Sequence, residues 1–127
     1  MARIRFDNVS REVVVAVGSS ILEAARLGGA PEASRCGGVC ACSTCHVYVE
    51  RGLELLTPPN AAELDLLAIS ARAPRASSRL GCQARLVAEG ELCVRITEES
   101  FQAYLDTHPE DRERALSLWI AGKQGQP

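Results

Sequence analysis

The sequence contains few aromatic residues, a single lysine and no long apolar run. Aromatic side chains make up 4% of the 127 residues, and Lys123 stands against thirteen arginines that form no basic run. Nucleic-acid binding usually needs basic residues gathered with aromatic ones, so it has little support. No stretch approaches the roughly 20 apolar residues that cross a membrane, and residues 1–18 lack the apolar core of a secretory signal. We expect a monomeric, cytoplasmic protein with neither nucleic acid nor membrane as a partner.

Cysteine, by contrast, is concentrated in one segment. Residues 36–46 read CGGVCACSTCH, and the chain has six cysteines in total. Five residues separate Cys36 from Cys42, two separate Cys42 from Cys45, and thirty-six more precede Cys82. In a reducing compartment disulfides are disfavoured, and clustered cysteines more often bind metal or do redox work. The segment therefore predicts a metal or redox site.

An iron–sulfur cluster fits this pattern best, because thiolates are the ligands that such clusters take. The pair Cys42 and Cys45 can reach a cluster from one turn, and the longer interval to Cys36 can wrap around it. Gly37 and Gly38 allow backbone angles that bring amide groups close to sulfur. A [2Fe–2S] cluster bound by Cys36, Cys42, Cys45 and Cys82 is the leading interpretation.

Two other uses of the cysteines remain open. Four thiolates suit zinc, but structural zinc sites usually take two short Cys pairs, and Cys82 stands alone. A zinc-stabilised binding module without redox function is therefore the alternative. A thiol oxidoreductase would place its Cys-x-x-Cys at the start of a helix, whereas Cys42 and Cys45 precede an expected strand.

The segments CGGVCACSTCHVYV and SRLGCQ resemble the vertebrate-type, or adrenodoxin-like, [2Fe–2S] ferredoxins, over roughly residues 2–96. The resemblance implies a β-grasp fold and an electron-transfer protein rather than an enzyme. It implies that Cys36 and Cys42 bind the outer iron, and Cys45 and Cys82 the inner one. The partners implied are an NAD(P)H-dependent flavoprotein reductase and either a haem-thiolate monooxygenase or iron–sulfur assembly proteins.

Several residues near the ligands carry their own expectations. Cys40 would form a poor Cys-x-Cys pair with Cys42, so we place it outside the ligand set. Cys93 lies among alternating apolar residues and reads as a buried core thiol. His46 follows Cys45 and is expected to tie the cluster loop to the domain. Arg79 either braces a carboxylate or lies on the surface.

The hydrophobic pattern predicts an α+β domain with a small mixed sheet. A hairpin opens the chain, a helix capped by Ser19 or Ser20 follows, and the second helix has Leu64 and Leu67 on its apolar face. The expected strands are 3–7, 12–17, 46–50, 84–88 and 91–96, and the expected helices are 18–29 and 61–71.

Residues 97–127 read as a separate acidic extension of two short helices, 99–108 and 109–122, beyond a ferredoxin domain at 1–96. Its six acidic and three basic residues give a net charge of −3. Helix 61–71 offers only Glu63 and Asp65, whereas adrenodoxin-like members carry a strongly acidic face there for a basic reductase. The extension either replaces that docking face or packs apolar residues such as Phe101 and Trp119 on the domain, and we favour packing.

Overall fold

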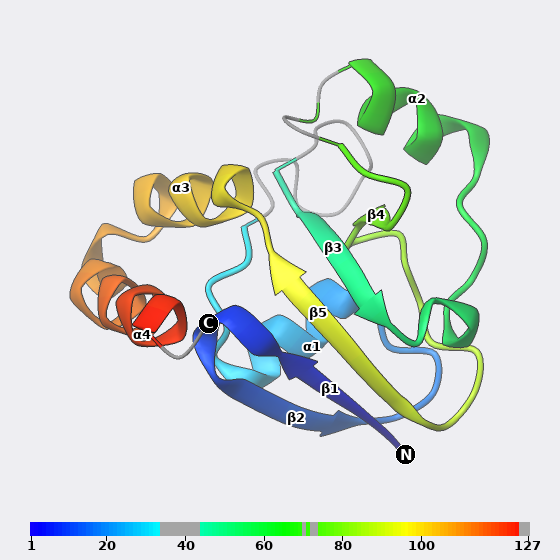
Figure 1. The fold of residues 1–127 in the computed structure, drawn as a ribbon, viewed down its shortest axis with the longest axis horizontal. Helices are drawn as coiled ribbons and strands as arrows, with labels where there is room; N and C mark the ends of the chain where they lie inside the picture. Colours follow the sequence, from blue (N-terminus) through cyan, green and yellow to red (C-terminus); the bar gives the residue numbers. More distant parts are fainter. Residues whose placement is uncertain (34–43, 70, 72–73, 125–127) are drawn as a thin grey trace.

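The computed structural model describes residues 1–33, 44–69, 71 and 74–124. Five strands form one mixed sheet in the order β2-β1-β5-β3-β4 (Figure 1). Strands β1 and β5 run parallel, and the other neighbouring pairs are antiparallel. The strands are β1 (Ala2–Phe6), β2 (Arg11–Val15), β3 (His46–Arg51), β4 (Ser78–Leu80) and β5 (Glu91–Ile96).

The opening hairpin forms as predicted from its alternating pattern. Ala2, Ile4 and Phe6 of β1 are buried, and the residues between them are exposed. A short 3-10 turn, η1 (Asp7–Val9), joins β1 to β2. Asn8 in this turn is buried and bonds the backbone of Ile96 in both directions, at 2.8 and 3.0 Å. The hairpin is thereby fastened to the end of β5.

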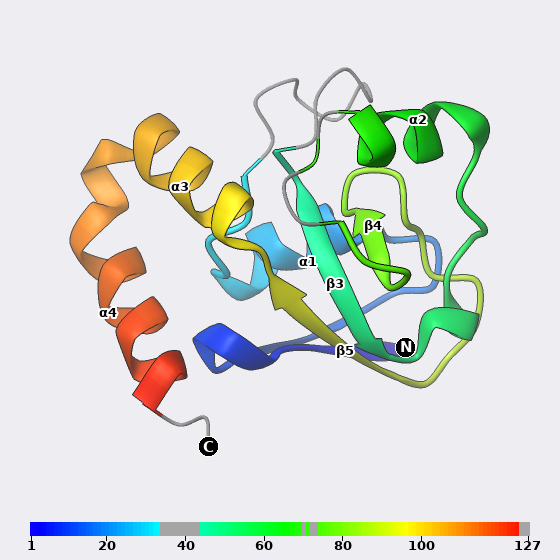
Figure 2. The same ribbon diagram turned by 45° about the horizontal axis from the view of Figure 1, so that its top comes forward.

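Helix α1 (Ile21–Gly28) covers one face of the sheet (Figure 2). The Ser20 hydroxyl caps it by accepting from the Glu23 amide at 3.1 Å, and Gly29 ends it with φ +72°. Gly29 adopts this left-handed conformation readily because it has no Cβ. Leu27, although apolar, is exposed on this helix. The core between helix and sheet is built from Ile4, Phe6, Val9, Ile21, Ala24, Ala25, Val47, Val49, Leu92, Val94 and Ile96.

Helix α2 (Ala61–Ile69) buries a different face from the predicted one. Leu67 is buried, but Leu64 is 53% exposed, and Glu63 takes the inward position. The Glu63 carboxylate accepts from Arg79 Nε at 2.6 Å, from Arg79 Nη2 at 3.1 Å and from the Leu80 amide at 3.0 Å. Arg79 therefore braces a carboxylate, as one of its two expected roles required. The apolar pattern predicted the wrong buried face of α2, because the charged residue Glu63 occupies a buried position.

One predicted strand is absent, and one strand of the sheet was not predicted. Residues 84–88 form no strand, although isolated bridges and backbone hydrogen bonds connect them to residues 18–21 and 55–57. The fifth strand of the sheet is β4, where no strand was expected. Its three residues are all buried, and they pair with the start of β3. A three-residue strand with a serine and an arginine shows no alternating pattern to detect.

The extension forms α3 (Glu98–Thr107), a 3-10 turn η3 (Pro109–Asp111) and α4 (Arg112–Gln124). Its apolar side chains pack on the domain, as we expected. Phe101, Leu105 and Ala115 belong to the main core, and the Phe101 and Trp119 rings stack with their centroids 4.3 Å apart. None of the helices in the described part of the chain has the length and apolar character to span a bilayer.

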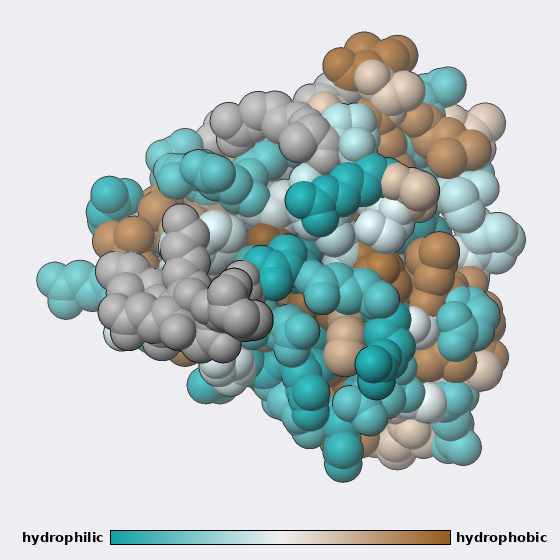
Figure 3. All heavy atoms as spheres, in the orientation of Figure 1, coloured by the Kyte–Doolittle hydropathy of each residue, from teal (hydrophilic) through white to brown (hydrophobic). Residues whose placement is uncertain are grey.

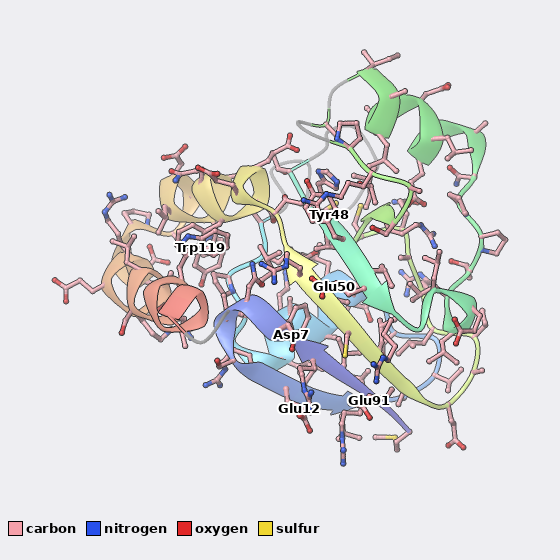
Figure 4. The ribbon with its side chains drawn as sticks, in the orientation of Figure 1. Asp7, Glu12, Tyr48, Glu50, Glu91 and Trp119 are labelled. Atoms are coloured by element: carbon pink, nitrogen blue, oxygen red, sulfur yellow. The ribbon has the colours of Figure 1, made fainter. Side chains whose placement is uncertain are left out.

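The sheet face turned away from α1 carries charges (Figure 4). Glu12 lies 3.1 Å from Arg3 and 3.5 Å from Arg5, and Arg95 lies 2.6 Å from Glu50. Such exposed pairs add little stability each. They keep this part of the sheet in contact with water, whereas the main hydrophobic core lies on the side of α1.

The buried pair of Glu63 and Arg79 gives a stability prediction. Their side chains are only 1% and 4% exposed, so Glu63→Gln leaves the arginine buried without a counter-charge. We expect a loss of about 3–5 kcal/mol, the usual cost of breaking a buried pair on one side. Urea unfolding followed by circular dichroism measures it. Asp65→Asn, an exposed change on the same helix, should cost less than about 0.5 kcal/mol. Equal unfolding midpoints would contradict this role.

Candidate metal centre

Two of the predicted ligands meet at one end of the sheet. Cys45 directly precedes β3, and Cys82 lies two residues beyond β4, where His46 pairs with Leu80. The Gly81 amide continues this pairing by donating to the Cys45 carbonyl at 2.9 Å. The two Sγ atoms lie 3.4 Å apart, and the residues are only 0% and 7% exposed. A short β-ladder thus places two thiols that are far apart in the sequence side by side.

The other cysteines divide into two groups. Cys36, Cys40 and Cys42 lie outside the described residues. Cys93 is a buried thiol in β5, where it pairs with Arg5 of β1, in agreement with its expected place in the core. Among the described residues no three His, Cys, Asp or Glu side chains gather into a metal site. Cys45 and Cys82 are therefore half of the predicted ligand set.

The geometry of this thiol pair suits a shared metal ion. Their separation of 3.4 Å exceeds the roughly 2.05 Å of a disulfide and approaches the ~3.8 Å between two thiolates on one tetrahedral metal with bonds near 2.3 Å. The hydrogen bond to Cys82 and burial raise the pKa of Cys45, and the nearby Glu32 raises it further. A bound cation would reverse that preference by supplying positive charge and displacing the protons. The residues present therefore fit a metal that takes thiolate ligands, such as the iron of the expected cluster.

Glu32 is a neighbour of this pair that the sequence did not reveal. It is 3% exposed, and neither carboxylate oxygen has a hydrogen-bond partner among the described residues. Burial raises its pKa well above the usual range, the Cys82 sulfur adds to this, and Arg26 opposes it. A Cβ at Gly81 would collide with Glu32 Oε2, so a larger residue beside the ligand would have to displace the Glu32 carboxylate. A lone acid between Pro31 and Ala33 carries no recognisable motif.

Gln83 also contacts the pair, from the residue after the second ligand. Its side-chain amide Nε2 lies 3.4 Å from Cys82 Sγ. An N–H group directed at a ligand sulfur stabilises negative charge there, and such bonds are one means by which proteins raise a cluster's reduction potential. The sequence SRLGCQ places this donor next to the ligand, although its direction could not be read from the residues alone.

His46, which follows Cys45 directly, connects the start of β3 to two other elements, β4 and α3, as expected of it. The ring is fully buried, with Nε2 2.7 Å from Ser78 Oγ and Nδ1 3.3 Å from Glu99 Oε1. Ser78 Oγ already accepts from the Arg75 amide at 2.7 Å, so its proton can donate to Nε2 and leave Nδ1–H for Glu99. Burial lowers the pKa of His46, and Glu99 opposes that shift.

An aromatic contact extends this arrangement toward the surface. The Tyr48 ring meets the His46 ring edge to face at 5.1 Å, and the Arg75 guanidinium lies 4.2 Å from the Tyr48 ring centre. Figure 4 shows Tyr48 near the start of β3, on the same end of the sheet as the thiol pair. The exposed Arg75, the Tyr48 ring and the buried His46 ring therefore pack against one another in a row that ends beside Cys45.

Comparison with known proteins identifies the family. A family profile described as "2Fe-2S iron-sulfur cluster binding domain" matches residues 4–87. Ferredoxin CarAc of Sphingomonas sp. is 49% identical over 72 residues, which cover 54% of this chain and 64% of that protein. The chain thus spans less than two thirds of the length of this relative.

Solved structures give the same result for the fold. The ISC-like [2Fe–2S] ferredoxin FdxB from Pseudomonas putida superposes with a TM-score of 0.68 at 34% identity, covering 77% of this chain and 94% of that one. A chain of the covalent putidaredoxin reductase–putidaredoxin complex gives 0.61 at 29% identity, covering 75% and 97%.

These matches confirm the expected β-grasp fold, the [2Fe–2S] cofactor and the electron-transfer class, and they give no support to the zinc-stabilised module. The metal that the thiol pair fits is thereby identified as iron in a sulfide-bridged cluster. The chain belongs to the family of 2Fe-2S iron–sulfur cluster binding domains, as a ferredoxin that carries electrons and is not an enzyme.

Proposed function

We propose that Cys36, Cys42, Cys45 and Cys82 bind a [2Fe–2S] cluster through which the chain passes single electrons in the cytoplasm, as a monomer. The donor is an NAD(P)H-dependent flavoprotein reductase, and the acceptor is a haem-thiolate monooxygenase or an iron–sulfur assembly system. The observation that carries the proposal is the 3.4 Å approach of two buried thiols, Cys45 just before β3 and Cys82 just after β4. Residues 1–96 would form the ferredoxin domain, and 97–127 its extension.

When bound, the cluster supplies a one-electron redox couple, with a formal charge of about −2 when oxidised and about −3 when reduced. The chain's own residues must hold that charge in a buried place. Cys45 and Cys82 hold one side of it, and Gln83 Nε2 directs an N–H group at Cys82 Sγ. His46 fixes the orientation of the strand that starts after Cys45 through its bonds to Ser78 and Glu99.

The choice of partners draws on two of the similar structures. One was solved as a covalent complex between putidaredoxin and its reductase, which supports a reductase as the electron donor. Another is described as an ISC-like ferredoxin, which keeps assembly proteins among the acceptors. Both kinds of partner must approach the end of the sheet where Cys45 and Cys82 lie, because electrons enter and leave at the cluster.

Next to that end of the sheet, α2 presents an apolar rather than an acidic surface. Leu64 and Ile69 are 53% and 83% exposed, and apolar side chains gather over α2 at the upper right of Figure 3. A groove of about 490 Å³ runs between α2 and the segment that precedes β4. Glu63 is buried against Arg79, so Asp65 is the acidic residue that α2 exposes. We therefore propose hydrophobic docking in place of charge steering.

The ligand proposal is tested by Cys82→Ser. We expect the variant to lose the brown colour, the iron and the acid-labile sulfide, because oxygen is a poor ligand for this cluster. Anaerobic reconstitution followed by visible absorbance and metal analysis provides the measurement. Cys93→Ser is the matched control, a second buried cysteine that should keep a full cluster. A colourless wild type with one zinc per chain would refute the proposal and revive the zinc module.

The docking proposal is tested by Ile69→Ser, measured as the rate of cluster reduction by a putidaredoxin-reductase-type flavoprotein. We expect a loss of about fivefold, since a well-buried apolar contact contributes on the order of 1 kcal/mol. Leu27→Ser is the control, because Leu27 is 73% exposed on α1, away from the cysteine pair.

Salt provides the complementary test of the same surface. We expect the wild-type rate to change less than about threefold between 50 and 500 mM salt, because few charges steer the encounter. A tenfold fall, with Ile69→Ser matching the wild type, would show that docking is electrostatic after all.

A further inference from the structure

Both described flanks of the cysteine-rich segment 34–45 are bonded to the same helical turn. On one side, the Ala33 amide donates to Ser100 Oγ at 3.0 Å. On the other side, Thr97 Oγ1 donates to the His46 carbonyl at 2.7 Å, and Glu99 lies 3.3 Å from His46 Nδ1. All three partners come from the first turn of α3 and its cap, in the C-terminal extension. Figures 1 and 2 show α3 starting beside the start of β3.

The turn that makes these bonds is itself well ordered by hydrogen bonds and burial. Thr97 is the helix cap, and its hydroxyl accepts from the Ser100 amide at 3.2 Å while donating to His46. Thr97 and Ser100 are 4% and 0% exposed. The hydroxyls are therefore fixed in direction, because each has defined partners in a place that water does not reach.

Packing in the rest of the extension keeps this turn in place. Phe101 follows Ser100 directly, is 2% exposed and stacks on Trp119 of α4. Arg114 of α4 donates to the Gly29 carbonyl at 2.9 Å, at the end of the helix that leads into residues 30–33. The extension thus makes two hydrogen bonds to the chain just before the cysteine-rich segment. One joins α3 to Ala33, and the other joins α4 to Gly29.

We propose that Thr97, Glu99 and Ser100 form a clamp that fixes both flanks of the cysteine-rich segment and so retains the [2Fe–2S] cluster. This inference rests on the proposed function, in which Cys36, Cys42 and Cys45 of that segment are ligands. The three are positioning residues, since they contact Ala33 and His46 and not the cluster. The clamp gives the extension a function in cluster retention in addition to its packing on the domain.

The physical basis is pre-organisation of the ligands. Fixing the two flanks removes conformational freedom from a chain segment that would otherwise have to be ordered each time a thiolate rebinds iron. A ligand that detaches then returns faster than the cluster escapes. Partners of metal ligands are known to change metal affinity by tenfold or more, and a single net hydrogen bond corresponds to roughly a fivefold effect.

The decisive experiment compares two glutamates on the same turn. Glu99 reaches His46 and is 12% exposed, whereas Glu98 is exposed. We expect Glu99→Ala, which removes the acceptor for His46 Nδ1–H, to shorten the half-life of cluster absorbance in the presence of an iron chelator about fivefold and to alter the electron paramagnetic resonance of the reduced cluster. Glu98→Ala removes a carboxylate from the same turn and should leave both unchanged, with similar melting temperatures for the two variants.

A second pair of variants tests the other flank. Ser100→Ala removes the acceptor for Ala33 and should shorten the half-life about threefold or more. Thr107→Ala, which removes hydroxyl bonds at the far end of α3, should not. The clamp is refuted if Glu99→Ala retains its cluster as long as the wild type, or if both glutamate variants lose it equally fast. A wild type without iron and sulfide would instead refute the proposed function, and the clamp with it.

Discussion

The antiparallel pairing of β3 with β4 is the constraint on which the site depends. It is only three residues long, yet it brings Cys45 and Cys82 together across a long sequence separation. The pairing places charged and polar residues in the interior, and each of them is satisfied. Arg79 of β4 is neutralised by Glu63, and Ser78 bonds His46 across the ladder. An unpaired buried charge costs several kcal/mol, so loss of these bonds would disrupt the pairing of β3 with β4. The two thiols would then no longer be held close together.

The same pairing explains why α2 exposes even less acidic charge than its two acidic residues would allow. One of its two predicted surface acids, Glu63, is used internally to hold Arg79, which leaves leucine and isoleucine on the outside. Exposed apolar side chains beside a redox site indicate a partner surface, since they are otherwise a solubility cost. Burial of one carboxylate therefore links the stability of the cluster end of the sheet to the kind of surface that it offers.

The sequence predicted those features that depend on local pattern, and it missed those that depend on long-range contact. The hairpin, the Ser20 cap and β5 follow from alternation and capping, and the ligand spacing pointed to the cofactor. Strand β4 was missed because its three residues gain their order from β3 and not from their own preference. Residues 84–88 alternate like a strand but lie where no neighbouring strand accepts them. Glu32 and Glu99 became visible as site neighbours only when the chain was folded.

The extension shows how apolar and polar residues divide this work. Phe101, Leu105 and Ala115 join the main core, and that burial supplies the free energy that holds α3 and α4 in place. The polar residues on the first turn add little net stability, because they exchange bonds with water for bonds with protein. Their contribution is to fix the position of the neighbouring backbone. Ser100 accepts a hydrogen bond from the Ala33 amide, and Thr97 donates one to the His46 carbonyl. In the proposed function the cysteine-rich segment binds the cluster, and a helix outside the sheet then supplies part of the rigidity of its two flanks, Ala33 and His46.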